Sequence, residues 1–502
     1  MRTSHPMKPG IVACLLLAAA MLLPSAASAG PEPAAQGGRG FRLFARSLGA
    51  LTVNRIYCGL SSDGNICVDS LGSSTIGGGY WPKGTPDQYI FNSGLQIAGI
   101  IGEDGGPWAT DTTGAFFFDP KGTTVHGEEV RPIFNSANPA DLAAWPEAAF
   151  VRGELFDPLL QGRPIASQGD IWFMSWDGNP GLTAGRPHPL GVVVETRGMG
   201  WNYPSGNEDV LYFIYTFYNV TTTDPAAYTQ YDPSLQEILL EKAADFQLLN
   251  ERAFDVDLPD AGYTITEMYA AFAADNDVAN AGANYSSVNL PFALGYTYEH
   301  TFTRQEDLGW IFPADIFGDP FFPGAGFIGM KYLKSPTGAG EIQLYSNTLN
   351  SATGFRDPQN TSQLFRYLSG NISTAAGDQP CNVADPRVCF IAPSAADTRF
   401  FQSSTALELA PGGSGTIVIA YIMAAPVGSN NAYVPSGSAD VKPGDVLATA
   451  DAAKLSASGV VPLVDSLTGF LGWEDDPENP DGVPQQAEFD VVPRSLLGKS
   501  LT

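Results

Sequence analysis

The segment from Asp209 to Val220 constrains the fold more than any other part of the sequence. Successive side chains of a β-strand point to opposite faces, so residues two apart share a face. Both alternating sets of this segment are apolar or aromatic. The first set is Leu211, Phe213, Tyr215 and Phe217, and the second is Tyr212, Ile214, Thr216 and Tyr218. We therefore expect a strand that is buried on both faces, in a sheet covered by another layer.

Further segments are typical of short strands separated by turns. The chain contains 55 Gly and 39 Pro residues, whereas only 16% of its residues are charged. This composition is typical of β-rich globular proteins. The sequence thus predicts a mainly β fold with a large β-sandwich-like region. The other segments that favour strands are 55–58, 88–91, 95–101, 170–176, 190–196, 265–273, 292–301, 326–333, 341–346 and 416–425.

Two segments favour helices. In the first, Asn138 is a suitable N-cap, and Pro139 suits the first position of a helix of one or two turns. In the second, Ser234 and Glu237 match a capping box, and apolar residues follow at helical spacing. We expect the second helix, at 234–250, to be an insertion that packs against the sheet.

The first 29 residues are typical of a secretory signal peptide. A basic start with Arg2 and Lys8 precedes an apolar stretch at 11–23 and the small residues at 27–29. The apolar stretch is too short to span a membrane as a stable helix. We expect cleavage after Ala29, no membrane span in the remaining chain, and a protein that is secreted, at the outer surface or in the periplasm.

The rest of the chain divides by composition. Residues 30–426 form the β-rich region, which has the length of one or two subdomains. Gly, Ser, Asn and Pro are frequent at 427–442, and this stretch is predicted to be a linker. Residues 443–502 are predicted to form a small C-terminal segment of helix and loop. Because the chain stops directly after a strand-like stretch, we expect it to be a fragment of a longer protein.

The chain is acidic, with 53 Asp and Glu residues against 26 Lys and Arg residues, a net charge of -27. Arg2 and Lys8 belong to the signal peptide, so the remaining chain has 24 basic residues and a net charge of -29. Phosphate groups are bound by Lys and Arg, and the charge therefore argues against nucleic acid and anionic lipid as partners. It suits a solvated extracellular surface, and it also suits sites for divalent cations.

Four cysteines follow the signal peptide, in two local pairs. Cys58 lies near Cys67, and Cys381 lies near Cys389. An even number of cysteines at short spacing in an exported chain predicts two disulfides that close loops. A zinc site is the alternative, but it calls for closer cysteine spacing or nearby histidines, and the histidines of this region are isolated.

The C-terminal segment contains an acidic loop that is similar to an EF-hand loop. Gly482 matches the glycine that allows the sharp turn in such loops. The first ligand position falls on Pro477, whose side chain cannot bind a metal ion. Asp476 can be the first ligand only if the loop holds one extra residue. The alternative is an acidic turn exposed to solvent. The candidate Ca2+ ligands are Asp476, Asn479, Asp481 and Glu488.

A second acidic cluster lies between two predicted strands. Asp275 and Asp277 are followed by Asn280 and Asn284. Alternating oxygen-bearing side chains in a loop can surround a hard cation such as Ca2+. Asp and Asn also favour turns for backbone reasons alone, which is the alternative interpretation.

Aromatic residues offer a candidate binding surface for sugars. Trp172, Trp176 and Trp201 could form a stacking face if they are exposed, whereas aromatic residues in strands more often belong to the core. A row of exposed rings would indicate a carbohydrate-binding module.

Catalytic motifs are absent from the sequence. It contains no G-x-S-x-G, H-E-x-x-H, P-loop or C-x-x-C pattern. A glycoside hydrolase needs only two suitably placed carboxylates. The carboxylates close to the aromatic strands are Asp170, Glu195, Glu208 and Asp209.

Several stretches together resemble a family of large, mostly uncharacterised secreted or cell-surface proteins of Gram-negative bacteria. The resemblance covers roughly residues 45 to 425. It implies a large β-sandwich-like region, and longer members carry fibronectin-type or sorting domains after it. Acidic residues are expected in that family where Asn280 and Asn284 stand here, and no activity follows from the resemblance. The stretches that carry it are 79–85, 89–97, 141–146, 169–172, 176–178, 202–204, 209–219, 272–277 and 294–298.

The sequence as a whole favours a non-enzymatic structural or adhesive protein that is secreted or held at the cell surface. Ca2+ is the expected stabilising ligand, and the partner is expected to be a cell-surface protein or glycan. An extracellular carbohydrate-binding module is the first alternative, and a glycoside hydrolase is the second.

Overall fold

The computed structural model of the chain describes residues 46–69, 77–81, 83–84, 88–101, 111–116, 127–178, 188–203, 207–278, 281–299, 327–337, 342, 344–350 and 354–424. The chain divides into two units, Met1–Leu43 and Phe44–Thr502, and all of these residues belong to the second. The predicted signal peptide, the predicted linker and the C-terminal segment lie outside the described residues. The candidate ligands of that segment, Asp476, Asn479, Asp481 and Glu488, therefore stay predictions.

The larger of the two main sheets has eight antiparallel strands, in the order β12-β13-β14-β19-β10-β9-β8-β7. Strand β10 lies between β9 and β19, and all of its residues except Thr216 are buried. The prediction of a strand with two buried faces is therefore confirmed. The strands are β7 (Glu128–Asn135), β8 (Gly169–Trp176), β9 (Val192–Gly200), β10 (Val210–Asn219), β12 (Asn284–Asn289), β13 (Leu294–Glu299), β14 (Phe327–Lys334) and β19 (Ser414–Ala424).

The second main sheet has seven strands, in the order β16-β15-β17-β11-β5-β6, and β18 pairs with β11 outside this path. Only the pairing of β15 with β16 is parallel within this described sheet. Its strands are β5 (Asn92–Ile101), β6 (Asp111–Phe116), β11 (Ile265–Asp275), β15 (Leu344–Leu349), β16 (Val388–Phe390), β17 (Thr398–Ser403) and β18 (Leu407–Leu409).

A third, smaller sheet has four strands, which pair in the order β1-β2-β3-β4. Its strands are β1 (Leu48–Leu51), β2 (Tyr57–Ser61), β3 (Gly79–Tyr80) and β4 (Gln88–Ile90).

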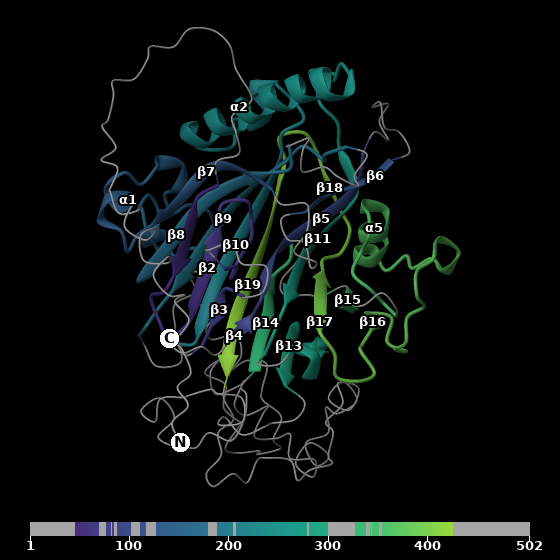
Figure 1. The fold of residues 1–502 in the computed structure, drawn as a ribbon. Helices are drawn as coiled ribbons and strands as arrows, with labels where there is room; N and C mark the ends of the chain where they lie inside the picture. Colours follow the sequence, from purple (N-terminus) through teal and green to yellow (C-terminus); the bar gives the residue numbers. More distant parts are fainter. Residues whose placement is uncertain are drawn as a thin grey trace, which may run out of the picture. The chain divides into compact units, whose positions relative to one another are not determined.

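The two main sheets pack face to face around an aromatic core. The ring of Phe272 in β11 lies 6.4 Å from that of Tyr215 in β10 and 5.3 Å from that of Tyr421 in β19, measured between centroids. The hydroxyls of Tyr421 and Ser93 in β5 are hydrogen-bonded at 2.6 Å. Figure 1 shows β10 and β19 beside β5 and β11. The predicted mainly β, sandwich-like fold is confirmed.

The helices flank the sheets, and α2 adds apolar side chains such as Leu235 and Phe246 to the same core cluster. The predicted short helix is α1 (Pro139–Ala143), and the side chain of Asn138 accepts a hydrogen bond from the Ala140 amide, as its N-cap role requires. The predicted insertion is α2 (Pro233–Leu249), where Lys242 lies 5.0 Å from the ring of Trp176 in β8. The sequence did not predict α5 (Thr361–Ser369). Shorter turns are η1 (Glu147–Ala149), η2 (Pro158–Leu160), η4 (Pro225–Tyr228), η5 (Asn250–Phe254), η6 (Ala281–Ala283), η7 (Leu290–Phe292) and η8 (Thr374–Ala376).

The predicted capping box at the start of α2 is wrong. The N-cap is Asp232, two residues before Ser234, so Ser234 lies inside the first turn. Pro233 occupies the first helical position, because its fixed φ suits a helix start and its missing amide hydrogen would have had no partner there.

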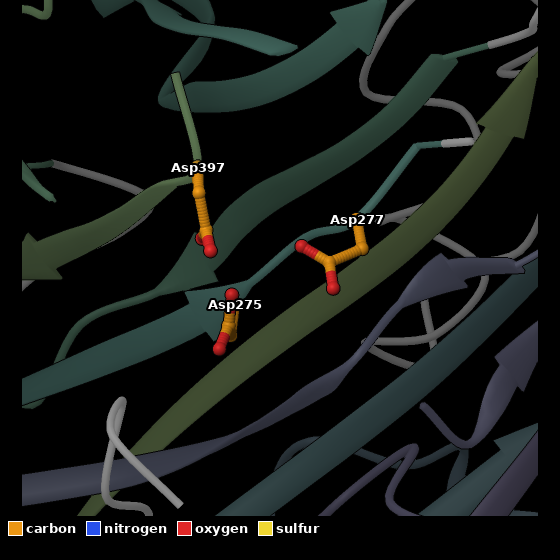
Figure 2. A group of neighbouring side chains, drawn as sticks. All are labelled: Asp275, Asp277 and Asp397. Carbon is orange, nitrogen blue, oxygen red and sulfur yellow. The ribbon is translucent and has the colours of Figure 1, made fainter. Parts of the chain in front are cut away.

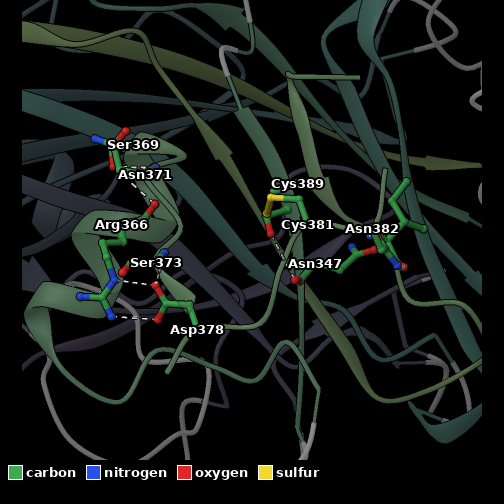
Figure 3. Close-up of a disulfide and its surroundings, with 11 residues drawn as sticks. Asn347, Arg366, Ser369, Asn371, Ser373, Asp378, Cys381, Asn382 and Cys389 are labelled. Carbon is green, nitrogen blue, oxygen red and sulfur yellow. Dashed lines mark hydrogen bonds and ion pairs between the residues drawn. A yellow bond between two sulfur atoms is a disulfide. The ribbon is translucent and has the colours of Figure 1, made fainter. Parts of the chain in front are cut away.

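Both predicted disulfides are present, and an ion pair lies near the second. Cys58 pairs with Cys67, and Cys381 pairs with Cys389. Figure 3 shows the Cys381–Cys389 bond and, on the neighbouring α5, Arg366 facing Asp378. Arg366 donates two hydrogen bonds to Asp378, of 2.5 and 2.8 Å, which fasten the loop after α5 to the helix.

Replacement of Phe272 by alanine tests the contact between the sheets. The ring is fully buried, so its loss leaves a cavity, and we expect the free energy of unfolding in urea to fall by about 3–5 kcal/mol. Tyr203→Ala, at a side chain that is 73% exposed, is the control and should cost less than about 0.5 kcal/mol. An equally small cost for Phe272→Ala would contradict the packing.

The Arg366–Asp378 pair predicts a dependence of stability on pH. Burial acts to raise the pKa of Asp378, but hydrogen bonds from Arg366 and the Ser373 amide outweigh it and hold that pKa below its ordinary value. The unfolded chain therefore takes up this proton at a higher pH than the folded chain does. The stabilisation is complete above the ordinary aspartate pKa and is lost as the pH falls through the lowered folded value.

We accordingly expect Asp378→Asn to be less stable than wild type at neutral pH, and the difference to shrink in acid. Urea denaturation at several pH values measures it. Glu154→Gln, at an exposed carboxylate, is the control and should differ little from wild type throughout. A difference for Asp378→Asn that does not change with pH would show that the ion pair is not its cause.

Candidate metal centre

Three carboxylates from distant parts of the sequence meet at one end of the seven-stranded sheet. Asp275 is the last residue of β11, Asp277 follows two residues later, and Asp397 directly precedes β17. Each offers an oxygen, and these oxygens all lie within 4.8 Å of one another. Figure 2 shows the three side chains converging from these two segments.

The register of the sheet determines which face carries the centre. Asp275 follows Ala271 and Ala273 at the two-residue period of β11, and those alanines pack in the apolar cluster that includes Leu364 and Leu368 of α5. The intervening Phe272 belongs to the core between the sheets. The acidic centre therefore lies on the outer face of the seven-stranded sheet, which faces away from the eight-stranded sheet.

Within the described part of the chain, one buried arginine, Arg399, contacts the acidic residues. Arg399 lies opposite Asp275 in the pairing of β11 with β17. Its Nε is 2.9 Å from Asp275 Oδ2, and its Nη1 is 3.1 Å from Asp397 Oδ1 and 3.8 Å from Asp357 Oδ2. When all are ionised, these three carboxylates and Asp277 carry four negative charges against one positive charge. The group then has a net charge of -3 in a largely buried position.

Hydrogen bonds do not compensate for this burial. Among the described residues, Asp275 Oδ1 has no hydrogen-bond partner and Asp275 Oδ2 has only the 2.9 Å ion pair with Arg399, although the side chain is only 1% exposed. Asp277 Oδ1 also has no partner there, whereas Asp277 Oδ2 accepts a hydrogen bond from Gln88 at 3.4 Å. Asp397 Oδ1 has only its 3.1 Å ion pair with Arg399, and Asp397 Oδ2 accepts a hydrogen bond from Asn350 at 3.0 Å. Buried polar atoms in proteins are nearly always paired, and the single guanidinium of Arg399 does not reach Asp275 Oδ1 or Asp277 Oδ1, so the centre suits a second cation.

The pKa values of the carboxyls reflect the same imbalance. Burial raises the pKa of Asp275 well above its ordinary value, and Asp277, Asp397 and Asp357 raise it further against the opposing effect of Arg399. Burial and Asp397 raise the pKa of Asp277 to about 6. The ionised centre is therefore unfavourable in the folded protein unless another cation shares it.

The donor set fits a hard divalent cation. Carboxylate oxygens are the preferred ligands of Ca2+ and Mg2+, whereas zinc sites favour nitrogen and sulfur. Asp275, Asp277 and Asp397 would hold the ion, and Arg399 and Asp357 would lie beside them. A bound divalent cation would reduce the net charge of the group from -3 to -1.

The structure brings together only part of the acidic cluster that the sequence suggested. Asp275 and Asp277 meet as expected, but Asn284 does not join them. It accepts a hydrogen bond from the Val278 amide at 2.8 Å and donates one to the Val278 carbonyl at 2.7 Å, so it closes the loop. Asn280 lies outside the described residues. Asp397 was missed, because it lies about 120 residues further along the chain and only the pairing of β11 with β17 brings it near.

The predicted sugar-stacking face is wrong for two of its three tryptophans. Trp172 and Trp176 in β8 are 0% and 5% exposed, because this strand is buried on both faces. Their indole nitrogens donate to Glu195 at 2.9 Å and to Glu128 at 3.0 Å. Trp201 is half-buried against the ring of Tyr212. A sugar ring cannot stack on a buried face, and Trp172 and Trp176 form part of the core.

The carboxylates considered for glycoside hydrolysis have structural partners. Asp170 pairs with Arg197, Glu195 with Arg152, and Asp209 with Arg55. Each of these three acids is buried. Glu208 also lies near Arg55, at 3.8 Å. The ion pairs give these acids a role in holding strands and loops together.

Among the described residues, no helix is both long and apolar enough to cross a membrane. No family model matches the chain, and no curated protein matches it significantly.

Replacement of Arg399 by methionine tests the charge balance of the centre. Without the guanidinium, the buried carboxylates lose their cation, and we expect the free energy of unfolding in chelator to fall by about 3–5 kcal/mol. Lys334→Met breaks an ion pair with the exposed Glu154 and should cost less than about 1 kcal/mol. Equal small losses for both variants would mean that Arg399 does not balance a buried charge.

Proposed function

We propose that the protein is a non-enzymatic structural or adhesive protein, secreted or held at the cell surface, and that its β-sandwich is stabilised by bound Ca2+. The observation that carries this proposal is the acidic centre on the outer face of the seven-stranded sheet. It combines three converging carboxylates, a net charge of -3 when Asp357 and Arg399 are counted with them, and two buried oxygens, Asp275 Oδ1 and Asp277 Oδ1, that have no partner among the described residues.

A cation in this centre would act on stability. Its ligands come from the end of β11, from the loop that follows it and from the residue before β17. One ion would therefore hold two strand ends and a loop in place. Because the ligands come together only in the folded chain, binding would favour the folded state.

Several features support a location outside the cytoplasm. The two disulfides suit an oxidising compartment, where such bonds persist. The predicted signal peptide supplies the route of export, and Ca2+ is abundant enough outside cells to fill sites of modest affinity.

The carboxylates that are held in ion pairs support a structural role for the protein. Asp170, Glu195 and Asp209, which the glycosidase hypothesis needed, are buried in ion pairs. The buried Trp172 and Trp176 likewise give no support to a carbohydrate-binding face.

Thermal unfolding of the full chain in Ca2+ and in chelator tests the proposal. We expect Ca2+ to raise Tm, since a ligand at about 100 times its Kd adds about 2.7 kcal/mol to the stability of the folded state. The double variant Asp275→Asn, Asp397→Asn should lose this response. It should be at least as stable as wild type in chelator, because two of the mutually repelling carboxylates become neutral.

Asp481→Asn is the matched control, because it removes a candidate ligand of the C-terminal loop. It should keep most of the Tm increase. If Ca2+ leaves Tm of the wild type unchanged, the proposal is wrong. If only Asp481→Asn abolishes the increase, the stabilising ion binds in the C-terminal loop and not at the sheet.

A further inference from the structure

We infer that Asn92 is a fourth protein ligand of the acidic centre, and that the resulting ligand set selects Ca2+ over Mg2+. This inference rests on the proposed cation site. It adds a neutral oxygen ligand, a third strand and a preference between the two ions.

The register of the sheet brings Asn92 to the centre. Asn92 is the first residue of β5 and lies directly opposite Asp275 in the antiparallel pairing of β5 with β11. Opposite residues of such a pair share one face of the sheet, with Cβ atoms about 4.5–5.5 Å apart. The row continues with Gly94 opposite Ala273, which places Asn92 on the face that carries the acidic residues.

The side chain of Asn92 also has an unused acceptor. It is 3% exposed, and its Oδ1 has no hydrogen-bond partner among the described residues. An amide oxygen has two lone pairs and is a normal ligand of Ca2+. Asn92 Oδ1 thus lies across the strand pair from Asp275, whose Oδ1 also has no partner among the described residues, and this points to a cation between them.

Asn276 provides a matched comparison. It is also buried, at 1% exposed, and its Oδ1 likewise has no partner among the described residues. Its Nδ2, however, donates to Thr297 Oγ1 at 3.1 Å, and Thr297 belongs to β13 of the eight-stranded sheet. Asn276, directly after the end of β11, therefore faces the eight-stranded sheet, although it stands between Asp275 and Asp277 in the sequence.

This ligand set favours the larger ion. Ca2+ binds six to eight oxygens and accepts amide oxygens in flexible geometry, whereas Mg2+ keeps several waters and uses one or two carboxylates. Three carboxylates and an amide supply four protein ligands. The side chain of Asp397 is 31% exposed, so this side of the centre is open to the water ligands that would complete the shell of Ca2+.

The added ligand changes what the ion connects. Strands β5, β11 and β17 are neighbours in the sheet, with β11 in the middle. With Asn92 as a ligand, one ion links the ends of all three strands.

Calorimetric titration of the full chain with Ca2+ and with Mg2+ tests the inference. All proteins carry Asp481→Asn, which silences the candidate site of the C-terminal loop. We expect Asn92→Ala to weaken Ca2+ binding at least tenfold and Asn276→Ala to change it less than threefold. Mg2+ should bind the protein with unaltered Asn92 at least tenfold more weakly than Ca2+ does.

Asn92→Asp provides a second test of the inference if Asn92→Ala fails to fold. It replaces the amide by a carboxylate, so Ca2+ binding should be several-fold tighter in this variant. If Ca2+ binds equally well with Asn, Ala and Asp at position 92, the inference is wrong and the proposed cation site stands. Equal affinity for Mg2+ would overturn the selectivity. Failure of the protein with unaltered Asn92 to bind Ca2+ would instead refute the proposed function.

Discussion

The burial of Asp275 beside Arg399 is the interaction on which this end of the sandwich depends. The pairing of β11 with β17 places the two residues opposite each other, with almost no exposure to water. One guanidinium could balance one carboxylate, but Asp277, Asp357 and Asp397 share the same surroundings. The resulting excess of negative charge is costly in a medium of low dielectric constant, and a bound divalent cation is the simplest way to reduce it.

The fold explains why such a centre lies at this place. The inner face of the seven-stranded sheet is occupied by Phe272 and its aromatic neighbours, whereas the outer face is covered by α5 and the segment around Phe355. The acidic residues lie where the apolar row of Ala271 and Ala273 ends. A cation at the strand ends would therefore stabilise the sheet beyond the reach of its apolar contacts.

Local patterns in the sequence predicted much of the fold. The double-sided apolar pattern of β10, the cap at Asn138 and the cysteine spacing each depend on residues that are close in sequence. The site depended on pairing between distant strands, so Asp397 could not be placed beside Asp275 in advance. The burial of Trp172 could not be predicted either, because the alternation of side chains along a strand does not show whether a face meets solvent or another layer of the protein. Helix α5 could have been found, since Asn360 caps its start and Gly370 ends it in a left-handed conformation.

The most direct test of the central claim is a crystal structure of the protein grown in Ca2+, with anomalous scattering to locate the ion. The account predicts a peak about 2.3–2.6 Å from oxygens of Asp275, Asp277 and Asp397. Absence of a peak there, with water molecules instead hydrogen-bonded to the carboxylate oxygens that Arg399 does not reach, would contradict it.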